Sequence, residues 1–375
     1  MLTRENLSSA KRIVIKVGTS TLTHATGKLN LLRIEKLARE LSDLANQGKQ
    51  IILVSSGAVG AGMDRLGLKD KPKTIPEKQA AAAVGQGILL HIYEKMFGEY
   101  GQIVAQVLLT RADSVNRKRY TNSRNTLMAL LNQGVIPIIN ENDAVAIDEL
   151  KIGDNDTLSA MVASIIDADL LIILSDIEGV YTANPQTDPQ AALVSEIADI
   201  TPAIEDMAGG PGTLRGTGGM YTKIQAAKIA VNSGVTMVIA SGGREGVVRD
   251  IIRGSKVGTI FMSKESRLHI RKRWLAFGVR VSGRVIVDKG CEAALLKEGS
   301  SLLAAGITAV EGNFELGNTI SIVSVCGQEL ARGISNYSSD DVKKIKGAHT
   351  HEISMLLGSK PYDEVVHRDN LVLLV

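Results

Sequence analysis

Five short apolar runs along the chain are each followed by small polar residues or glycine. Apolar runs without a polar alternation are typical of strands that are buried on both faces of a parallel sheet. In such sheets ligands bind beyond the carboxyl ends of the strands, so we expect the polar clusters to form one site. The runs are residues 13–15, 51–54, 135–139, 170–174 and 235–239.

Helical periodicity separates these runs. Apolar residues share one face between 34 and 45, where Asn30 is placed to cap the helix and Gly48 to end it. Because strands that alternate with helices form βαβ units, the pattern predicts the α/β class, with a mostly parallel sheet sandwiched by helices. Further helices are predicted over residues 76–97, 156–166 and 220–232.

Two places depart from this regular pattern. Pro137 lies inside an apolar run, and proline cannot donate to a sheet ladder, so we expect a sheet edge or a local irregularity there. Residues 145–152 alternate between apolar and polar side chains, which predicts a small hairpin.

The pattern changes after about residue 261, where short β-type runs and frequent glycines begin. With 375 residues, two domains are the default expectation. We therefore expect an α/β domain over residues 1–262, a small mostly-β domain over residues 275–360, and a C-terminal tail over residues 361–375. The β-type runs are residues 279–281, 284–287, 319–325 and 330–334.

Composition excludes several classes of protein. The net charge is +3 and aromatic residues make up 3% of the chain, which does not favour a dedicated nucleic-acid binder. No apolar stretch approaches the roughly 18 residues of a membrane span, and the N-terminal residues lack a secretory apolar region. Cys291 and Cys326 have no zinc-site spacing, so we expect no protein-held metal and a reducing, cytoplasmic setting.

A glycine-rich segment, residues 216–223, precedes a predicted helix and ends in Lys223. Glycines let backbone N–H groups approach a phosphate, and a helix N-terminus favours negative charge. The segment matches neither the Walker A pattern nor the dinucleotide fingerprint. A surface loop with a solvated lysine is the alternative interpretation.

Lys16 lies within the first apolar run, where a charge needs a partner. It could extend from the strand end to water, or contact phosphate together with the Gly18–Thr19–Ser20 turn. Two lysines that contact one phosphate would stabilise its binding strongly, because each charge pair about 4 Å apart is worth roughly 4 kcal/mol at an effective dielectric near 20.

Amide and carboxylate side chains follow the 135–139 run and recur close to residue 155. Asn140, Asp143, Asn155 and Asp156 could bind an amino acid or hold the lysines, although a solvated loop, with Asp156 as a helix N-cap, is the alternative. Ser56 could donate to a substrate carboxylate or be an ordinary turn serine.

These motifs, in this order, resemble the amino acid kinase family, and within it the members that phosphorylate glutamate. The C-terminal part is similar to a PUA domain, on residues 283–288 and 299–307. The matching pieces are residues 16–20, 54–58, 137–143, 153–156, 175–181 and 216–223.

The resemblance implies ATP-dependent phosphorylation of the γ-carboxylate of L-glutamate, the first step toward proline. A glutamate side chain has a reference pKa of about 4.3, so it is already an anionic nucleophile and needs no general base. By the same resemblance, Lys16 and Lys223 stabilise the transferring phosphoryl group and Asp156 orients them. Glutamate is held by Ser56, Asp143, Asn155 and Asn140, and ATP by Lys16, Ser175, Asp176, Thr217, Gly218, Gly219, Met220, Tyr221, Thr222 and Lys223.

The resemblance also implies magnesium bound through the ATP phosphates, a homo-oligomer, and association with a glutamyl phosphate reductase. Three alternatives stay open on the residues alone. They are a related kinase with another acid or a nucleotide as acceptor, an RNA-binding protein built around the C-terminal part, and a nicotinamide dehydrogenase, which would lack its glycine fingerprint.

Overall fold

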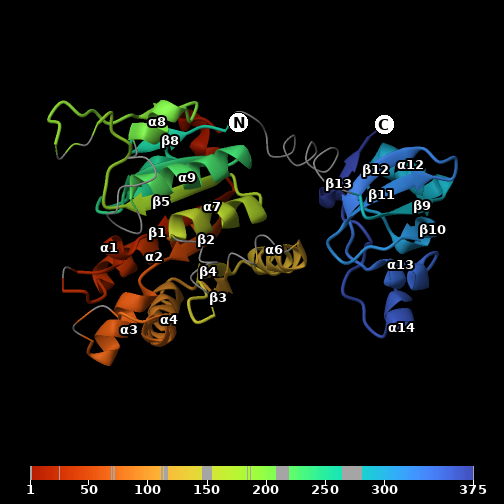
Figure 1. The fold of residues 1–375 in the computed structure, drawn as a ribbon, viewed down its shortest axis with the longest axis horizontal. Helices are drawn as coiled ribbons and strands as arrows, with labels where there is room; N and C mark the ends of the chain where they lie inside the picture. The colour runs from red at the N-terminus through yellow and green to blue at the C-terminus, as the bar shows by residue number, and fades with distance from the viewer. Residues whose placement is uncertain are drawn as a thin grey trace. The chain divides into compact units, whose positions relative to one another are not determined.

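The chain forms two compact units, one built mainly from residues 1–267 and the other mainly from residues 268–375 (Figure 1). The structure is a computed structural model. It describes residues 2–24, 26–68, 70, 72–110, 113, 117–145, 154–183, 185, 187–207, 219–263 and 281–374. Of the hairpin predicted over residues 145–152, only residue 145 is among the described residues, and the rest of it lies outside them.

The N-terminal unit is built around a sheet that has eight strands in the described part of the chain, in the order β3-β4-β2-β1-β5-β7-β8-β6. The strands from β3 to β7 in that order are parallel, and β8 pairs antiparallel with β7. The strands are β1 (Arg12–Val17), β2 (Gln50–Ser55), β3 (Val104–Leu109), β4 (Ile136–Glu141), β5 (Leu170–Ser175), β6 (Glu196–Ile197), β7 (Thr236–Ser241) and β8 (Thr259–Phe261).

The five apolar runs are confirmed as the parallel strands β1, β2, β4, β5 and β7. Strand β3 was missed because it is not a continuous apolar run: Gln106 interrupts it, and most of its residues are only partly buried. That pattern follows from its place at the edge of the sheet, where one side of the strand has no strand beside it.

Pro137 lies in β4, which has β3 on one side and β2 on the other, so the predicted edge position is wrong. The ladder that joins β4 to β2 contains the pairs Leu53–Ile138 and Val54–Ile139 and begins one residue after the proline. This short ladder is the local irregularity that the sequence allowed as the second possibility.

The predicted helices are confirmed with small shifts at their ends. The side chain of Asn30 accepts the backbone N–H of Arg33, and Gly48 has a φ of 86° just after the helix. Thr74 and Glu77 form a capping box that spans Pro76 at the start of the helix over residues 75–98. The helices are α1 (Thr19–Leu22), α2 (Leu31–Asn46), α3 (Ala58–Leu66), α4 (Ile75–Gly98), α6 (Arg117–Asn132), α7 (Asn155–Ile165), α8 (Pro202–Met207), α9 (Met220–Asn232) and α10 (Val247–Ile252), with the 3₁₀ turn η1 (Arg4–Ser9).

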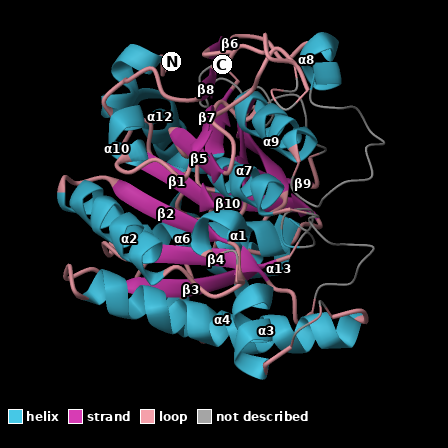
Figure 2. Cartoon of the chain, turned by 90° about the vertical axis from the view of Figure 1, so that its left-hand side faces the viewer, coloured by secondary structure: helices cyan, strands magenta, loops and turns pink. Residues whose placement is uncertain are grey.

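The two faces of the sheet carry different helices (Figure 2). Ile13, Ile15 and Val17 belong to one buried cluster with the apolar faces of α2 and α4. Because successive side chains of a strand point to opposite faces, Lys16 faces the other side. There α7 and α9 pack against one another, α7 over β1 and α9 over β7.

The C-terminal unit holds a five-stranded sheet in the order β10-β9-β11-β12-β13 within its described residues. Residues 361–375 contribute β13, which pairs antiparallel with β12 and buries Val372. The elements are β9 (Gly283–Val287), α12 (Lys289–Glu298), η4 (Ala304–Gly306), β10 (Ile307–Gly312), β11 (Thr319–Ser324), β12 (Glu329–Ile334), α13 (Ser339–Ile345), α14 (Ile353–Leu357), η5 (Arg368–Asn370) and β13 (Leu371–Leu373). Across all described residues, the helices are too short or too polar to cross a membrane.

Candidate active site

Polar side chains line up along the carboxyl ends of four neighbouring strands of the N-terminal unit. Asn140 belongs to β4, Ser56 follows β2, Lys16 belongs to β1 and Ser175 ends β5. These strands are adjacent in the order β4-β2-β1-β5. The sheet therefore brings together residues that are up to about 160 positions apart in the sequence. Thr217 and Gly218 lie outside the described residues.

A buried ion triad joins Lys16, Asp156 and Lys223. The Nζ of Lys16 lies 2.6 Å from one carboxylate oxygen of Asp156, and the Nζ of Lys223 lies 3.1 Å from the other. Asp156 is 0% exposed, and the two lysines are 5% and 4% exposed. The three residues come from β1, α7 and α9, so the lysines converge only because both helices pack on the Lys16 face of the sheet. Neither lysine is a solvated surface residue.

Opposing effects act on the carboxyl of Asp156. Burial by itself would raise its pKa, but the two ammonium groups of Lys16 and Lys223 hold the pKa below its ordinary value. Asp156 is therefore an anion that holds two cations, and it is poorly suited to accept a proton. The alternative interpretation of Asp156 as a helix N-cap is wrong, because Asp154 caps α7 by accepting the backbone N–H of Asp156.

Asp154 is a second carboxyl beside the triad, and it is not among the site residues predicted from the sequence. The Oγ1 of Thr222 donates to Asp154 at 2.9 Å and lies 3.2 Å from Asp156, which ties the start of α9 to the start of α7. Burial, reinforced by the charge of Asp156, raises the pKa of Asp154. In the sequence, the position of Asp154 two residues before Asp156 could have pointed to a role at this site.

An amide network lies next to the triad along the chain, since Asn155 precedes Asp156. The Nδ2 of Asn155 donates to the Oγ of Ser56 at 2.8 Å and to the Oδ1 of Asn140 at 2.9 Å. The three side chains come from α7, the end of β2 and β4. Three of the four residues predicted to hold glutamate are thus joined by direct hydrogen bonds.

Helix α4 supplies two further polar groups that the sequence analysis missed. The Nδ2 of Asn140 donates to the Oε1 of Gln86 at 2.9 Å. The hydroxyls of Tyr93 and Ser55 lie 2.8 Å apart, and Ser55 in turn donates to the carbonyl of Ser56. In the sequence, the position of Gln86 between two glycines could have pointed to it, because such glycines allow close helix packing. A Cβ at Gly85 would lie 1.7 Å from the carbonyl oxygen of Ala58 in α3.

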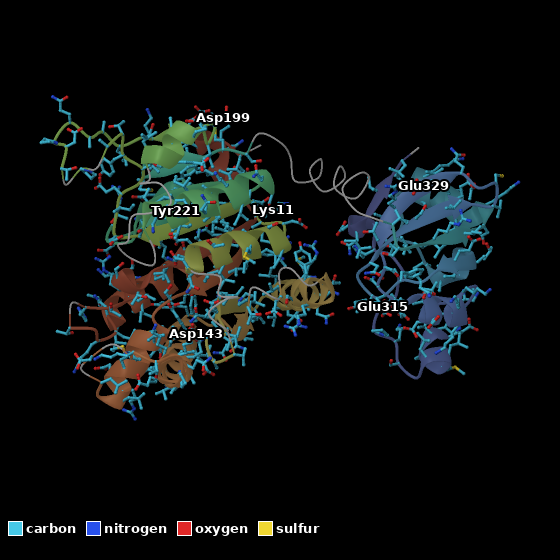
Figure 3. The ribbon with its side chains drawn as sticks, viewed as in Figure 1. Lys11, Asp143, Asp199, Tyr221, Glu315 and Glu329 are labelled. Carbon is cyan, nitrogen blue, oxygen red and sulfur yellow. The ribbon has the colours of Figure 1, made fainter. Side chains whose placement is uncertain are left out.

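The remaining predicted residues surround this centre. The Oγ of Ser175 donates to Asp176 at 2.9 Å, at the end of β5. Gly219 is the N-cap of α9 and Tyr221, in its first turn, is 37% exposed. Asp143 is half-buried in the turn after β4. Figure 3 labels Asp143 and Tyr221. Among the described residues, no group of three or more His, Cys, Asp or Glu side chains could hold a metal ion.

A parallel sheet between helices, with two lysines and the start of a long helix converging at its carboxyl edge, defines an α/β protein built to bind an anion such as phosphate. The amino acid kinase family model matches residues 11–241, and the PUA domain model matches residues 283–357. The chain belongs to the amino acid kinase family. The resemblance stated from the sequence motifs is thereby confirmed.

The chain is similar to curated relatives over nearly its whole length. It is 58% identical to a protein called glutamate 5-kinase from Moorella thermoacetica, over 98% of this chain and 97% of the relative. It is 47% identical to a protein of the same name from a Geobacter species, over 99% of this chain and 100% of the relative. Among solved structures, carbamate kinase from Giardia lamblia bound to AMP-PNP matches 68% of this chain and 100% of its own, with a TM-score of 0.51 at 19% identity. That match supports the fold.

Proposed function

We propose that the chain transfers the γ-phosphoryl group of ATP to the γ-carboxylate of L-glutamate and forms L-glutamyl 5-phosphate, the first step of proline biosynthesis. The observation that carries the proposal is the buried Lys16–Asp156–Lys223 triad beside the Asn155 amide network. Relatives that are 47–58% identical over nearly the full chain carry the name glutamate 5-kinase, which supports the choice of glutamate.

The triad suits a reaction between two anions. The γ-carboxylate is ionised at neutral pH and attacks without a general base, so the barrier lies in bringing it against the negative phosphates. Lys16 and Lys223 offset that repulsion and stabilise the charge on the transferring phosphoryl oxygens. Asp156 holds both ammonium groups in place before the substrates bind, so they need little reorganisation during the reaction.

The amide network is placed to hold the acceptor. Asn155, Asn140 and Ser56 carry N–H and O–H groups that can donate to carboxylate oxygens. Asp143 supplies a carboxylate that can pair with the substrate ammonium. These neutral donors and one anion suit an amino acid better than a nucleotide, which disfavours a nucleotide as acceptor.

ATP would lie over the ends of β5 and β1 and against the start of α9. Ser175, Asp176 and residues 217–223 are its proposed contacts, together with Lys16. Magnesium fits as an ion carried by the ATP phosphates, because Mg²⁺ keeps most of its waters and takes few protein ligands. When bound there it would neutralise phosphate charge, and we assign it no protein ligand.

The proposal includes the organisation of the protein. It has a kinase domain over residues 1–262 and a PUA domain over 275–360, followed by a tail over 361–375. The matches of the two family models, to residues 11–241 and 283–357, fall within the two domains and support this division. A homo-oligomer and a cytoplasmic location belong to the same proposal, and the two free cysteines are compatible with a reducing compartment. Because an acyl phosphate is labile, association with a glutamyl phosphate reductase would protect the product.

Hydroxylamine trapping tests the reaction directly. The full chain is incubated with ATP, magnesium and hydroxylamine, and with glutamate, aspartate, acetylglutamate or uridylate in turn. A hydroxamate that depends on glutamate identifies both the acyl phosphate and its acceptor. No hydroxamate with any of the acids, from protein shown to be folded by circular dichroism, refutes the proposed function.

A further inference from the structure

Gln86 in α4 lies at the end of the amide network, and one of its polar atoms has no partner. Its Oε1 accepts a hydrogen bond from Asn140, while its Nε2 is buried and makes no hydrogen bond within the described structure. A buried amide donor without a partner is uncommon in a native protein and costs about 1–3 kcal/mol.

The hydrogen-bond network determines which end of the Gln86 amide is free. The backbone N–H of Glu141 donates to the Oδ1 of Asn140 at 2.9 Å, and a backbone N–H can only donate. The side of Asn140 that faces Gln86 is therefore its NH₂ group, and Gln86 must offer its oxygen there. The group of Gln86 that has no partner is thus its NH₂ group, a donor of two hydrogen bonds.

The order of the strands shows which part of a substrate this donor would meet. The phosphoryl group is transferred at Lys16 in β1, whereas Asn140 and its partner Gln86 lie at β4, two strands away. Two strand spacings are roughly 9.5 Å. Because the amide network of Asn155, Ser56 and Asn140 is the proposed acceptor site, a glutamate whose γ-carboxylate lies at the lysines would point its α-carbon end toward β4 and Gln86.

The backbone that carries Gln86 is held in place by close helix packing. A Cβ at Gly85 would lie 1.7 Å from the carbonyl oxygen of Ala58, and one at Gly62 would lie 1.8 Å from the carbonyl oxygen of Ala81. On the same helix, Leu89 is fully buried in the core. The position of the donor is therefore fixed before any substrate binds.

We propose that the Nε2 of Gln86 donates to the α-carboxylate of the acceptor and selects for acids that carry one. The same side chain orients Asn140 through its Oε1, so Gln86 has both a contact with the substrate and a positioning role. This inference rests on the proposed function and adds the residue that recognises the end of glutamate remote from the reaction.

Two substitutions separate these roles. Gln86→Glu keeps an oxygen for the Nδ2 of Asn140 but replaces the donor with a second oxygen. Gln86→Met removes both interactions at similar volume. The ligands are glutamate as substrate, with 4-aminobutyrate, which lacks the α-carboxylate, and glutarate, which lacks the ammonium, as competitive inhibitors.

We expect both variants to raise the KM for glutamate by about 10- to 100-fold, the value of one hydrogen bond to a charged group. The KM for ATP should stay within about twofold, and the Glu variant should be the weaker one because it opposes two carboxylates. The inhibition constant of glutarate should rise in parallel with the KM, while that of 4-aminobutyrate should not.

Three outcomes overturn the proposal. If Gln86→Glu keeps the wild-type KM while Gln86→Met does not, Gln86 acts only through Asn140. If both variants weaken all three ligands equally, the α-carboxylate is not what Gln86 recognises. If neither variant changes the KM for glutamate, Gln86 has neither role.

Gln102 offers a matched control, because it precedes β3 at the amino ends of the strands and its amide donates to Asn46. Gln102→Glu and Gln102→Met should leave the KM values for glutamate and ATP and both inhibition constants unchanged. Thermal unfolding of all four variants reports whether each is folded. A wild type without glutamate-dependent hydroxamate refutes the proposed function. A wild type that reacts, with variants that keep its selectivity, refutes only the inference about Gln86.

Discussion

The two units of this chain bury different kinds of polar group. The N-terminal unit places two lysines and an aspartate in its interior, where they are at most 5% exposed. The described part of the C-terminal unit buries hydroxyl and amide side chains, such as Ser335 and Asn336, but no charged one. Its ion pairs, such as Arg284 with Glu311, lie at the surface.

This difference in buried charge indicates that the N-terminal unit keeps charged side chains in its interior for a reason other than stability. Buried ion pairs contribute little net stability because desolvation of the charges offsets their attraction. A fold that needed only a core would use uncharged side chains at positions 16, 156 and 223, as the described part of the C-terminal sheet does at its buried positions. Charges retained in the interior, at the carboxyl edge of a parallel sheet, therefore mark the unit that carries the reaction.

The largest expected effect on the folded state comes from Asp156→Asn. It removes the buried carboxylate that both ammonium groups, of Lys16 and of Lys223, contact in the interior, which should lower the free energy of unfolding by about 3–5 kcal/mol. Urea unfolding measures this loss. The same change at Asp363, an exposed partner of Lys360 in the C-terminal unit, should have no measurable effect.

The pH dependence of that difference follows from the lowered pKa of Asp156. A carboxyl with a lowered folded-state pKa stabilises the fold above its ordinary value of 3.8, and the contribution is lost as the pH falls through the lowered pKa. The gap between wild type and variant should therefore be constant from about pH 5 to 8. A gap that closes near neutral pH would contradict the ion triad.

Removal of either lysine should have the largest effect on turnover. Lys16→Ala or Lys223→Ala deletes one preorganised cation at the transferring phosphoryl group, and we expect kcat to fall by about 10²–10³-fold. Steady-state ADP formation with saturating glutamate measures it. Lys36→Ala, at an exposed pair with Glu245, is the control and should stay within about twofold. A folded variant at position 16 or 223 with near-normal turnover would remove that lysine from the mechanism.

Asp154→Asn should change the free energy of unfolding by a smaller amount than Asp156→Asn, and should raise it instead of lowering it. Burial and the charge of Asp156 raise the pKa of Asp154, so its protonated form favours folding below the ordinary value of 3.8, and this contribution is lost as the pH rises through the raised pKa. Asparagine can also cap a helix, so the variant should be more stable than the wild type at neutral pH. The advantage should shrink as the pH falls toward 4, which unfolding curves at several pH values would show. A difference that does not depend on pH would contradict this assignment.

The smallest effect is expected from the C-terminal unit. Arg284→Ala breaks an ion pair whose side chains are 57% and 47% exposed, and such pairs contribute at most about 1 kcal/mol. Turnover with glutamate should not change. A loss of several kcal/mol would show that surface pairs in this unit matter more than the comparison of the two units implies.

The sequence by itself determined the order of the elements and most of the candidate site. Short continuous apolar runs between helical segments are typical of strands buried on both faces, because each residue in such a strand faces a helix layer on one side or the other. The caps at Asn30 and Gly48 fixed the ends of α2 for local reasons that need no tertiary contact. The residues at the strand ends were predictable because parallel strands bring their carboxyl ends to one edge.

Only the tertiary structure decided which of those residues touch and which others join them. Strand β3 and the interior place of Pro137 depend on strand pairing, which no local pattern specifies. The triad requires α9 to pack against α7, which lies over β1, and the hydrogen bond of Gln86 with Asn140 requires α4 to come within side-chain reach of β4. Distances between side chains from different elements are set by packing of the whole core, and packing is not encoded within any one segment.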